Sequence, residues 1–392
     1  MQKFDVAVIG GGAAGLACAV GLRERNKNLT VAVFEAGERA GRKIAASGNG
    51  QGNVSNADMS ASHYRGSCAS LAGKLCCSGL YNPLSLFDFL FTEDKSGRIY
   101  PAGKQASALV DCLLRRVETA GVKLCLSCAV KSLSKGFNLV LVGGEKIAAD
   151  RVVIATGGKA QRQFGSDGSG YEMVKQFGHS VTPLYPSLVQ LKCDARYIKS
   201  LKGIRAECRV SAFGGNGKLI KSTVGDVIFT DYGVSGNAIF YISSYCAGRD
   251  DVNLSLEFLP EISEERIAES VRARLAAGYP ESELLSGTLH NQIGRAVIRR
   301  CGGDPEAIAR TVKNFTLKVV GTLGFDYAQV TKGGVPADET DDGLQSKLVK
   351  NLYFAGEILD VDGDCGGYNL TWAFCSGLHV AHTILKETAG ND

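Results

Sequence analysis

The sequence predicts an α/β protein with a Rossmann-like dinucleotide-binding domain that is formed by both ends of the chain. Three observations support this fold class. At the N-terminus, an apolar segment runs into a glycine-rich turn and then a helical stretch, over residues 4–25. Residues 352–385 repeat the succession of strand, glycine-rich loop and helix. Between these segments the pattern changes, first to strands and then to helices, which indicates an insertion.

Chain length and these pattern changes predict the domain boundaries. The 392 residues exceed the usual size of one hydrophobic core, so more than one domain is expected. We expect residues 1–187 and 326–392 to form the cofactor domain, residues 188–255 a β-rich insert domain, and residues 256–325 a small helical subdomain.

Composition predicts a soluble globular protein. The formal net charge of +4 is mild, and Lys and Arg form no long run, so no nucleic-acid partner is expected. No apolar stretch is long enough to span a bilayer, and residues 1–9 read as a strand rather than a signal peptide. With 13 Cys in a long chain, we expect reduced thiols, a cytoplasmic location and no membrane partner. No oligomeric state follows from the sequence.

The first elements form a βαβ unit. Residues 4–9 read as a buried strand, residues 14–25 as a helix, and residues 29–34 as a second strand that ends at Glu35. A parallel sheet with a right-handed crossover is expected for such a unit.

The next segment predicts a helix, two further strands and a hairpin. We expect a helix at residues 110–120, a strand at 122–130, a hairpin from 137–142 and 146–148, and a short strand at 151–155. Cys125 and Cys128 fall in the first of these strands, residues 122–130, where an odd separation points side chains to opposite faces. We therefore interpret them as structural thiols rather than as a redox pair.

The middle of the chain changes character twice. Residues 188–244 are strand-like, and segments 206–213 and 218–224 flank a Gly-Gly-Asn-Gly hairpin turn. Helical spacing takes over at residues 261–301. Asp304 and Pro305 then match the N-cap and first turn of another helix.

The first motif is the glycine-rich turn Gly10-Gly11-Gly12-Ala13-Ala14-Gly15. In this spacing, the first glycine permits the tight turn, the second lets backbone approach a pyrophosphate, and the third lets the helix pack on the sheet. Glu35 follows at the end of the next strand, where a carboxylate binds ribose hydroxyls. A carboxylate there disfavours the 2′-phosphate of NADP.

A second set of turns favours FAD over a simple nicotinamide cofactor. Thr156-Gly157-Gly158 ends one strand, and Gly356-Glu357 ends a late one. FAD binds in an extended form, so a late strand end brings a carboxylate to its ribityl and phosphate region. A simple NAD dehydrogenase has no need of this second phosphate-side loop.

Two loops add exposed backbone N–H groups. The segment 42–53 carries Arg42 and Lys43 before a Ser-Gly-Asn-Gly turn, which suits phosphate or the flavin ring. Residues 360–369 superficially resemble a calcium loop, but Cys365 and Thr371 occupy the positions that require Gly and Glu, so no metal is expected. This glycine-rich loop instead opens a helix, whose positive end suits the N1–C2=O region of a reduced flavin.

The chain resembles a family of bacterial flavoproteins that includes aminoacetone oxidases and a dehydro-bile-acid reductase of gut bacteria, within the two-dinucleotide-binding superfamily. The resemblance runs nearly end to end. It rests on the glycine turn, the loop at residues 41–50, residues 97–101, 156–158 and 229–236, the Thr331-x-Gly-Gly-Val segment, and residues 352–373. It implies FAD, a β-rich insert, a small helical cap over the flavin, and adenine contacts from the backbone of the strand that carries Val130.

The chain departs from the family pattern at several positions. Gln51-Gly52 replaces the usual Arg-Cys, Thr371 replaces Gln, Asp231 replaces His and Asn237 replaces Pro. FAD contacts are expected to persist, because most come from glycine backbone. The substrate is not carried over from the family.

The expected cofactor-binding residues come from the motifs and the resemblance together. They are Gly10, Gly12, Ala13, Ala14, Gly15, Glu35, Ala36, Arg42, Lys43, Ser47, Gly48, Asn49, Gly50, Asn53, Val130, Thr156, Gly157, Gly158, Gly356, Glu357, Gly366, Gly367, Tyr368, Asn369 and Leu370.

The sequence therefore predicts an FAD-dependent oxidoreductase that acts on a small organic substrate by hydride transfer through the flavin. Two versions stay open: an oxidase that passes electrons to oxygen, and a reductase that takes hydride from NADH or NADPH as a transient donor. No second strand–G-x-G-x-x-G–helix unit is present for a dedicated nicotinamide domain. The alternatives are an RNA-associated flavoprotein and a non-catalytic FAD-binding module. No catalytic acid or base is named from the sequence.

Overall fold

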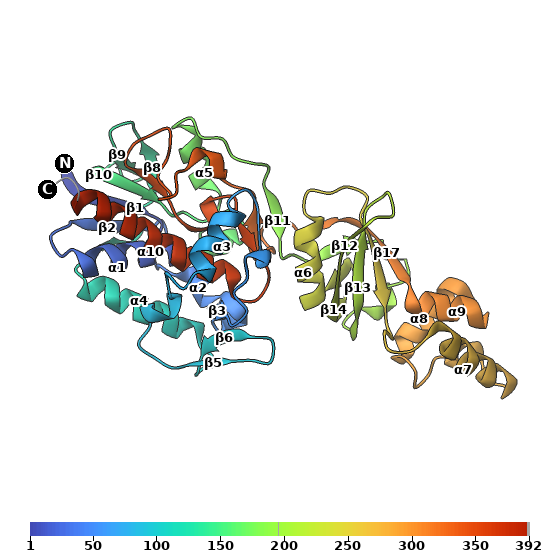
Figure 1. Ribbon diagram of the computed structural model, residues 1–392. Coiled ribbons are helices and arrows are strands. Elements are labelled where there is room, and N and C mark those ends of the chain that lie inside the picture. Colours follow the sequence, from blue (N-terminus) through green and yellow to red (C-terminus); the bar gives the residue numbers. More distant parts are fainter. Residues whose placement is uncertain (195, 390–392) are drawn as a thin grey trace. The chain divides into compact units, whose positions relative to one another are not determined.

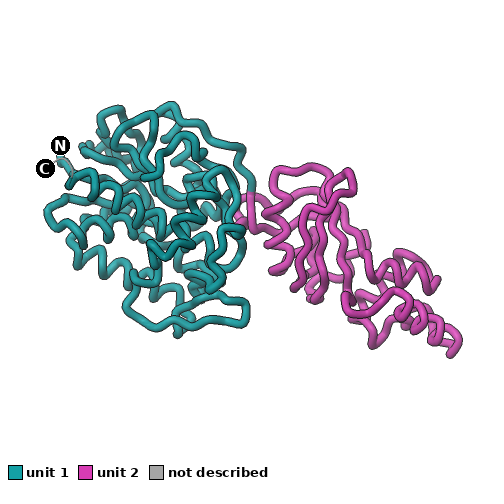
Figure 2. The backbone as a smooth tube through the Cα atoms, viewed as in Figure 1, with its two compact units in different colours: residues 1–185, 330–392 teal, residues 186–329 magenta. Residues whose placement is uncertain are grey.

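The computed structural model describes residues 1–194 and 196–389. They divide into two compact units (Figure 2): unit 1 is Met1–Tyr185 with Val330–Asp392, and unit 2 is Pro186–Gln329. The predicted boundaries at 187/188 and 325/326 thus lie a few residues from the observed ones. The chain leaves unit 1 within β11 (Tyr185–Ser187) and re-enters it at β18 (Val330–Lys332).

Unit 1 is built on a seven-stranded sheet in the order β7-β2-β1-β10-β9-β8, with β19 also paired to β10. The first strand, β1 (Gln2–Ile9), pairs in parallel with β2 (Val31–Phe34) and with β10 (Lys146–Ile154). The late strand β19 (Leu352–Phe354) pairs in parallel with β10. The predicted assembly of this sheet from both chain ends is therefore confirmed.

Two helices from opposite ends of the chain pack closely against each other on this sheet. They are α1 (Ala13–Arg25) and α10 (Tyr368–Ala389), which lie side by side in Figure 1. A side chain at Gly377 would place its Cβ 2.2 Å from the carbonyl oxygen of Ala14. Small residues at this crossing thus set the distance between the two helices.

The other elements of unit 1 cover the sheet or form short pairs beside it. The helices are α2 (Arg42–Ala45), α3 (Ala69–Cys77), α4 (Ala106–Thr119) and α5 (Ser169–Lys175). The strands are β3 (Ser55–Asn56), β4 (Tyr64–Arg65), β5 (Phe91–Glu93), β6 (Arg98–Pro101), β7 (Lys123–Cys125), β8 (Val130–Leu133), β9 (Asn138–Leu141) and β20 (Asp362–Gly363).

The strand predicted at residues 122–130 is too long, and the alternation expected for its two thiols does not hold. β7 ends at Cys125, and Ser127 has a left-handed φ of 54°. The amide of Glu35 donates to the Cys125 carbonyl at 2.9 Å, while the amide of Cys128 donates to the Glu35 carbonyl at 2.8 Å. Regular parallel pairing would use residues two apart, so this strand carries one extra residue. The extra residue breaks the alternation that was expected to point the two thiols to opposite faces.

Two further boundaries differ from the prediction. The segments 146–148 and 151–155 are one continuous strand, β10, because its second half is buried between β1 and β19. Residues predicted as strand include a helix, α6 (Asn237–Cys246). Its apolar and aromatic residues resemble a strand locally, but they pack as a helix on the neighbouring β14.

Unit 2 contains a closed barrel in the order β12-β15-β14-β13-β16-β17. Its strands are β12 (Leu191–Cys193), β13 (Arg205–Phe213), β14 (Leu219–Phe229), β15 (Gly233–Ser235), β16 (Asn253–Glu257) and β17 (Phe315–Thr322). The predicted hairpin is the antiparallel pair of β13 and β14. Asp304 caps the helix α9 (Pro305–Lys313), as predicted, by accepting from the Ala307 amide at 2.7 Å.

The helical region of unit 2 does not form a separate core. Its helices α7 (Glu264–Ala276), α8 (Asn291–Cys301) and α9 bury Val271, Val297 and Val312 in the same hydrophobic cluster as the barrel residues Leu256 and Phe315. The expected β-rich insert and helical subdomain are therefore one compact unit.

A pH-dependent contact fixes one loop of unit 1. Partial burial alone would raise the pKa of Glu339, but hydrogen bonds from Ser180 and His179 hold that pKa below its usual value. A depressed pKa stabilises the fold above the unfolded-state pKa, and this contribution is lost as the pH falls through the folded-state pKa. We expect E339Q to lower the free energy of unfolding by about 1 kcal/mol at pH 7.

The difference between E339Q and wild type should shrink as the pH falls through the lowered pKa of Glu339, because the wild-type carboxyl then becomes protonated. Urea denaturation at pH 7 and in the acid range measures this difference in the free energy of unfolding. A difference that stays constant across this range would contradict the assignment.

Candidate cofactor-binding site

The glycines in the turn between β1 and α1 have two different roles: two allow close packing, and one leaves space open. A Cβ at Gly10 would lie 2.4 Å from the Ala155 carbonyl oxygen, and one at Gly15 would lie 2.0 Å from the Gly10 carbonyl oxygen. These two positions are closed by packing. A Cβ at Gly12, which precedes the first residue of α1, would meet nothing within 4 Å. The helix N-terminus therefore faces open space, which fits an anion such as a pyrophosphate.

Glu35 is held in place at the end of β2. Its Oε2 accepts from the Gly11 amide and its Oε1 from the Gly37 amide, both at 2.8 Å. A carboxylate oxygen can accept further hydrogen bonds, so the group stays competent for ribose hydroxyls. A cavity of about 550 Å³ adjoins it, lined by Ala36, Gly37, Glu38, Arg39, Arg42 and Ser127.

The strand β8 begins close to this carboxylate. Val130 is its first residue and lies two positions after Cys128, whose amide bonds to the Glu35 backbone. Arg42 lines the cavity and also donates to the Gln163 carbonyl. The structure thus brings Glu35, Ala36, Arg42 and the start of β8 together.

We expect E35Q to weaken FAD binding by about 10-fold, because a hydrogen bond to a charged acceptor contributes about 1.5–3 kcal/mol, whereas one to a neutral acceptor contributes about 0.5–1.5 kcal/mol. Fluorescence titration of the apoprotein with FAD measures this. The matched control is E38Q, since Glu38 lines the same cavity but is exposed. Equal affinities of E35Q and E38Q would show that Glu35 does not bind the ribose.

The loop after α2 offers room and an unpaired hydroxyl. Gly48, Asn49 and Gly50 have left-handed φ values of 55°, 54° and 82°. A Cβ at Gly50 would meet nothing within 4 Å. The buried Oγ of Ser47 has no hydrogen-bond partner among the residues that the structure describes. A buried hydroxyl without a partner is costly, so it fits a ligand atom supplied from outside the chain.

Lys43, Glu357 and Thr331 join three distant segments. The Nζ of Lys43 lies 2.8 Å from Oε2 of Glu357, and Oε1 of Glu357 accepts from the Thr331 amide at 2.8 Å. A Cβ at Gly158 would lie 2.5 Å from Oγ1 of Thr331, so packing requires that glycine. Thr331 was absent from the expected site, although the Thr-x-Gly-Gly-Val segment signalled it.

Among the remaining turn residues of the expected site, some are fixed by packing or hydrogen bonds, and others carry polar atoms that are available to a ligand. Gly157 is left-handed with a φ of 73°, and the buried Oγ1 of Thr156 has no hydrogen-bond partner within the described part of the chain. Gly356 is fixed, since its amide donates to Ser376 and its carbonyl accepts from Trp372. Ala14 packs against this turn. Asn53 donates to the carbonyls of residues 55 and 99 and holds the loop.

The C-terminal loop places the start of α10 beside β3. The Gly366 carbonyl accepts from Nδ2 of Asn56 at 3.0 Å, and a Cβ at Gly367 would lie 2.3 Å from the Ser55 carbonyl oxygen. The Asn369 side chain pairs with both backbone groups of Gly363. Tyr368 and Leu370 follow in the first turn of α10, whose N-terminal amides face this loop.

Thr371 helps to hold this loop in place. Its Oγ1 donates to the Val54 carbonyl at 3.3 Å and lies 3.0 Å from Oγ of Ser55, and the residue is buried. The departure at this position therefore changes how α10 is fixed to β3.

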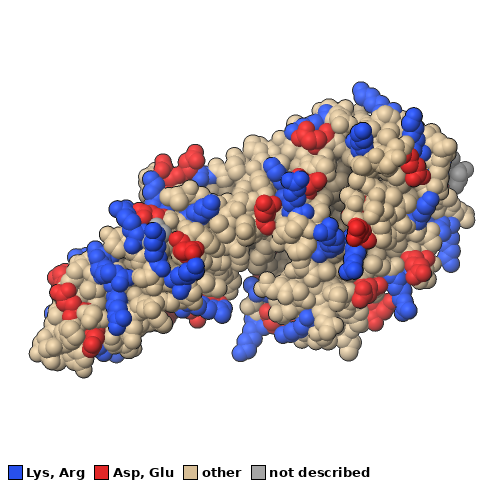
Figure 3. All heavy atoms as spheres, turned by 180° about the vertical axis from the view of Figure 1, so that it is seen from behind, with Lys and Arg blue, Asp and Glu red and all other residues tan. Residues whose placement is uncertain are grey.

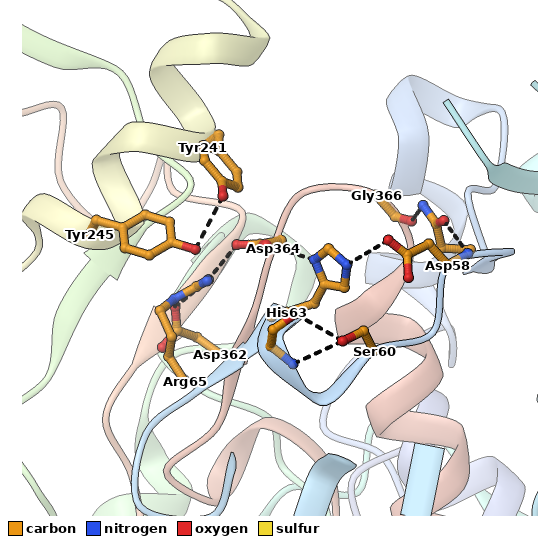
Figure 4. A network of polar contacts seen from close by, with 12 residues as sticks. Asp58, Ser60, His63, Arg65, Tyr241, Tyr245, Asp362, Asp364 and Gly366 are labelled. Carbon is orange, nitrogen blue, oxygen red and sulfur yellow. Dashed lines mark hydrogen bonds and ion pairs between the residues drawn. The ribbon is translucent and has the colours of Figure 1, made fainter. Parts of the chain in front are cut away.

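A polar network that was not predicted from the sequence lies beside the same loop (Figure 4). His63 lies between Asp58 and Asp364, and Arg65 pairs with Asp362 and Asp364. The signal for it was the Asp-x-Asp-x-Asp run at residues 360–364, which was compared only with a calcium loop. These carboxylates instead bind side chains, and Asp360 accepts from Ser67. Within residues 1–194 and 196–389, no group of three or more His, Cys, Asp or Glu residues is arranged to hold a metal ion.

Side chains of both charges are mixed on the surface. On the face drawn in Figure 3, Lys and Arg side chains are interspersed with Asp and Glu. Many cations of unit 2 are ion-paired, including Arg205 with Asp226, Lys202 with Asp231, Arg272 with Glu306 and Lys318 with Asp251. None of the helices in the described residues has the length and apolar character needed to cross a membrane.

Comparison with known proteins gives matches along almost the whole chain. Residues 4–383 match the family described as HI0933-like protein Rossmann domain. A 3-dehydro-bile acid delta(4,6)-reductase of Clostridium scindens is 33% identical, over 95% of this chain and 97% of that protein. A ribosomal RNA dihydrouridine synthase of Escherichia coli is 28% identical, over 98% and 99%.

Solved structures share the fold. A 3-ketosteroid delta1-dehydrogenase from Sterolibacterium denitrificans superposes with a TM-score of 0.54 at 12% identity, covering 99% of this chain and 100% of that one.

Proposed function

Because the chain belongs to the HI0933-like Rossmann-domain family, we propose that it is an FAD-dependent oxidoreductase that reduces a carbon–carbon double bond conjugated to a carbonyl group in a small organic substrate. The observation that carries the cofactor assignment is the open helix N-terminus at Gly12 beside the fixed carboxylate of Glu35. This pair fits the pyrophosphate and ribose of a dinucleotide.

The names of two relatives support the reaction class. One is named for reducing the delta(4,6) double bonds of a 3-dehydro-bile acid, and the other for making dihydrouridine in ribosomal RNA. A 3-oxo-Δ4 ring and a uracil ring both contain a double bond conjugated to a carbonyl. Both reductions add hydride to one carbon and a proton to its neighbour.

The residues of unit 1 would hold the cofactor at four points. The α1 N-terminus at Gly12 binds the pyrophosphate, and Glu35 binds the ribose. Lys43 and the loop at residues 47–50 lie toward the phosphates and ring edge. The N-terminus of α10 offers its positive end to the N1–C2=O region. Bound FAD supplies hydride transfer in its reduced state.

The electron donor in this proposal is NADH or NADPH, bound transiently at the flavin. The relative that is 33% identical is named a reductase, which favours this version over an oxidase. We place the enzyme in the cytoplasm, supported by its 13 free cysteines, which suit a reducing compartment.

The test begins with holoenzyme reconstituted with FAD. It is mixed anaerobically with NADH or NADPH, and then with 2-cyclohexenone or a 3-oxo-Δ4 steroid, while the flavin absorbance is followed. Bleaching by a nicotinamide and recovery with an enone are expected. Absence of stoichiometric FAD binding, or recovery with oxygen alone, would overturn the proposal.

A second candidate substrate is uridine in RNA, favoured by 28% identity to the Escherichia coli synthase over 98% of the chain. It uses the same reaction class. The formal net charge is only +4, and Asp and Glu are mixed among Lys and Arg on the face in Figure 3. This favours the small molecule, because RNA binding draws on concentrated positive charge. Mass spectrometry of unmodified ribosomal RNA after incubation with reduced enzyme would detect dihydrouridine and establish this candidate.

A further inference from the structure

We propose that His63 donates the proton in this reduction and that Asp364 positions its ring. The inference rests on the proposed function, because it concerns the second hydrogen that an enone reduction needs. It assigns the acid that the sequence did not name.

The imidazole of His63 is oriented by carboxylates on both sides (Figure 4). Its Nδ1 lies 2.9 Å from Oδ2 of Asp364, and its Nε2 lies 3.1 Å from Oδ2 of Asp58. The Asp364 amide also donates to the His63 carbonyl at 2.9 Å, so the two residues are joined twice. A carboxylate on Nδ1 fixes the ring orientation and leaves Nε2 as the nitrogen that exchanges protons outward.

The two carboxylates beside the ring differ in exposure, so the two ring nitrogens of His63 have different surroundings. The side chain of Asp364 is 5% exposed, whereas that of Asp58 is 72% exposed. Asp364 is therefore a fixed support. Asp58 is free to turn into solvent, so a substrate oxygen or carbon can take its place at Nε2.

The ring lies at the segment proposed for the flavin. It stacks on Tyr368, with ring centroids 4.2 Å apart and planes 19° from parallel. Tyr368 is the first residue of α10, and the Tyr64 hydroxyl donates to its carbonyl at 3.2 Å. His63 is thus held by contact with the helix N-terminus that we propose for the N1–C2=O end of the flavin.

Arg65 supports the carboxylate that holds the ring. Its guanidinium lies between Asp362 and Asp364, and both carboxylates are buried. The exposed Asp58 beside Nε2 provides a route for a proton from solvent.

The other four histidines either have hydrogen-bond partners of their own or lie exposed on the surface. Both ring nitrogens of His179 are bonded, to Glu339 and Ser346. His379 bonds to the Tyr81 hydroxyl and to the Asp342 carbonyl. His290 caps α8, and His382 is exposed on α10.

Hydride and proton add to neighbouring carbons in the proposed step. The hydride that bound, reduced FAD would supply, with NADH or NADPH as the reductant, forms one C–H bond at the β-carbon. The π electrons of the double bond move toward the carbonyl oxygen as the enolate. Nε2 of His63 then gives its proton to the α-carbon, and solvent reprotonates the neutral ring through Asp58.

The experiment compares H63Q and D364N with wild type and with H382Q, which makes the same change at an exposed histidine of α10. FAD affinity and visible absorbance are measured first and should match wild type. Each holoenzyme is then reduced with dithionite and mixed anaerobically with 2-cyclohexenone or a 3-oxo-Δ4 steroid. We expect reoxidation of H63Q to slow by about 100-fold or more, the usual range for losing a general acid.

Two further readouts separate proton donation from a structural role. Reoxidation by ferricyanide forms no C–H bond, so it should be unchanged in H63Q. A group that must be protonated to donate makes the rate with the enone fall as the pH rises. This fall is expected in wild type and should be absent in H63Q and altered in D364N, because Asp364 acts through the ring.

The outcomes distinguish the two proposals. If wild type reduces no enone, the proposed function fails. If wild type reduces it and H63Q does so at the same rate, or if ferricyanide slows equally, the assignment of His63 as the proton donor is overturned.

Discussion

Replacing Gly12 with leucine is expected to weaken FAD binding by at least about 100-fold, or about 2.8 kcal/mol, while the apoprotein stays folded. The backbone at Gly12 has φ −85° and ψ −170°, which any residue can adopt. A Cβ there meets no chain atom within 4 Å, so the added side chain fills only the space in front of α1. That space is where we propose the pyrophosphate lies.

Gly15 provides the contrasting variant. A Cβ at this position would lie 2.0 Å from the Gly10 carbonyl oxygen, so G15A should disturb the turn itself and lower the thermal midpoint of the apoprotein. Isothermal titration with FAD and thermal melts of both apoproteins make the comparison. A G12L protein that binds FAD as tightly as wild type would place the cofactor elsewhere.

Replacing Arg65 with methionine is expected to lower the free energy of unfolding by about 3–5 kcal/mol, because it leaves buried carboxylates without their counter-charge. The guanidinium contacts Oδ2 of Asp362 from Nε at 3.2 Å and from NH2 at 3.1 Å, and it also pairs with Asp364. Asp362 is fully buried. Urea unfolding of the apoprotein at pH 7 measures the change.

Two variants test this cause. Adding D362N to R65M removes one uncompensated charge and should recover part of the lost stability. R196M breaks an ion pair whose arginine is 77% exposed, and it should cost less than about 1 kcal/mol. Similar losses for R65M and R196M would contradict the role of burial.

The local turns of the proposed cofactor site could be predicted because each is a short-range requirement. The spacing of Gly10, Gly12 and Gly15 reflects contacts within one strand–turn–helix unit. Glu35 follows from the length of that unit. By contrast, helix α6 was mistaken for a strand, since its apolar and aromatic residues fit either state until the barrel beside it is known.

The thiols at residues 125 and 128 show where a prediction from the two-residue repeat of a strand fails. Side chains of a strand alternate between its two faces only while its pairing with the neighbouring strand stays regular. The hydrogen bonds of Cys125 and Cys128 to Glu35 span one residue too many, which ends the regular pairing. Nothing in the local sequence fixes where such a residue falls, because the neighbouring strand end decides it.

The sequence by itself determined the Rossmann-like domain, its completion by the C-terminus, and the glycine-rich segments expected to surround FAD. These depend on periodicity and on glycine spacing, which act over a few residues. Only the tertiary structure paired Lys43 with Glu357 and His63 with Asp364, residues about 300 positions apart. Such pairs form because α10 and β19 return to the first strands, and no local signal records which side chains then meet.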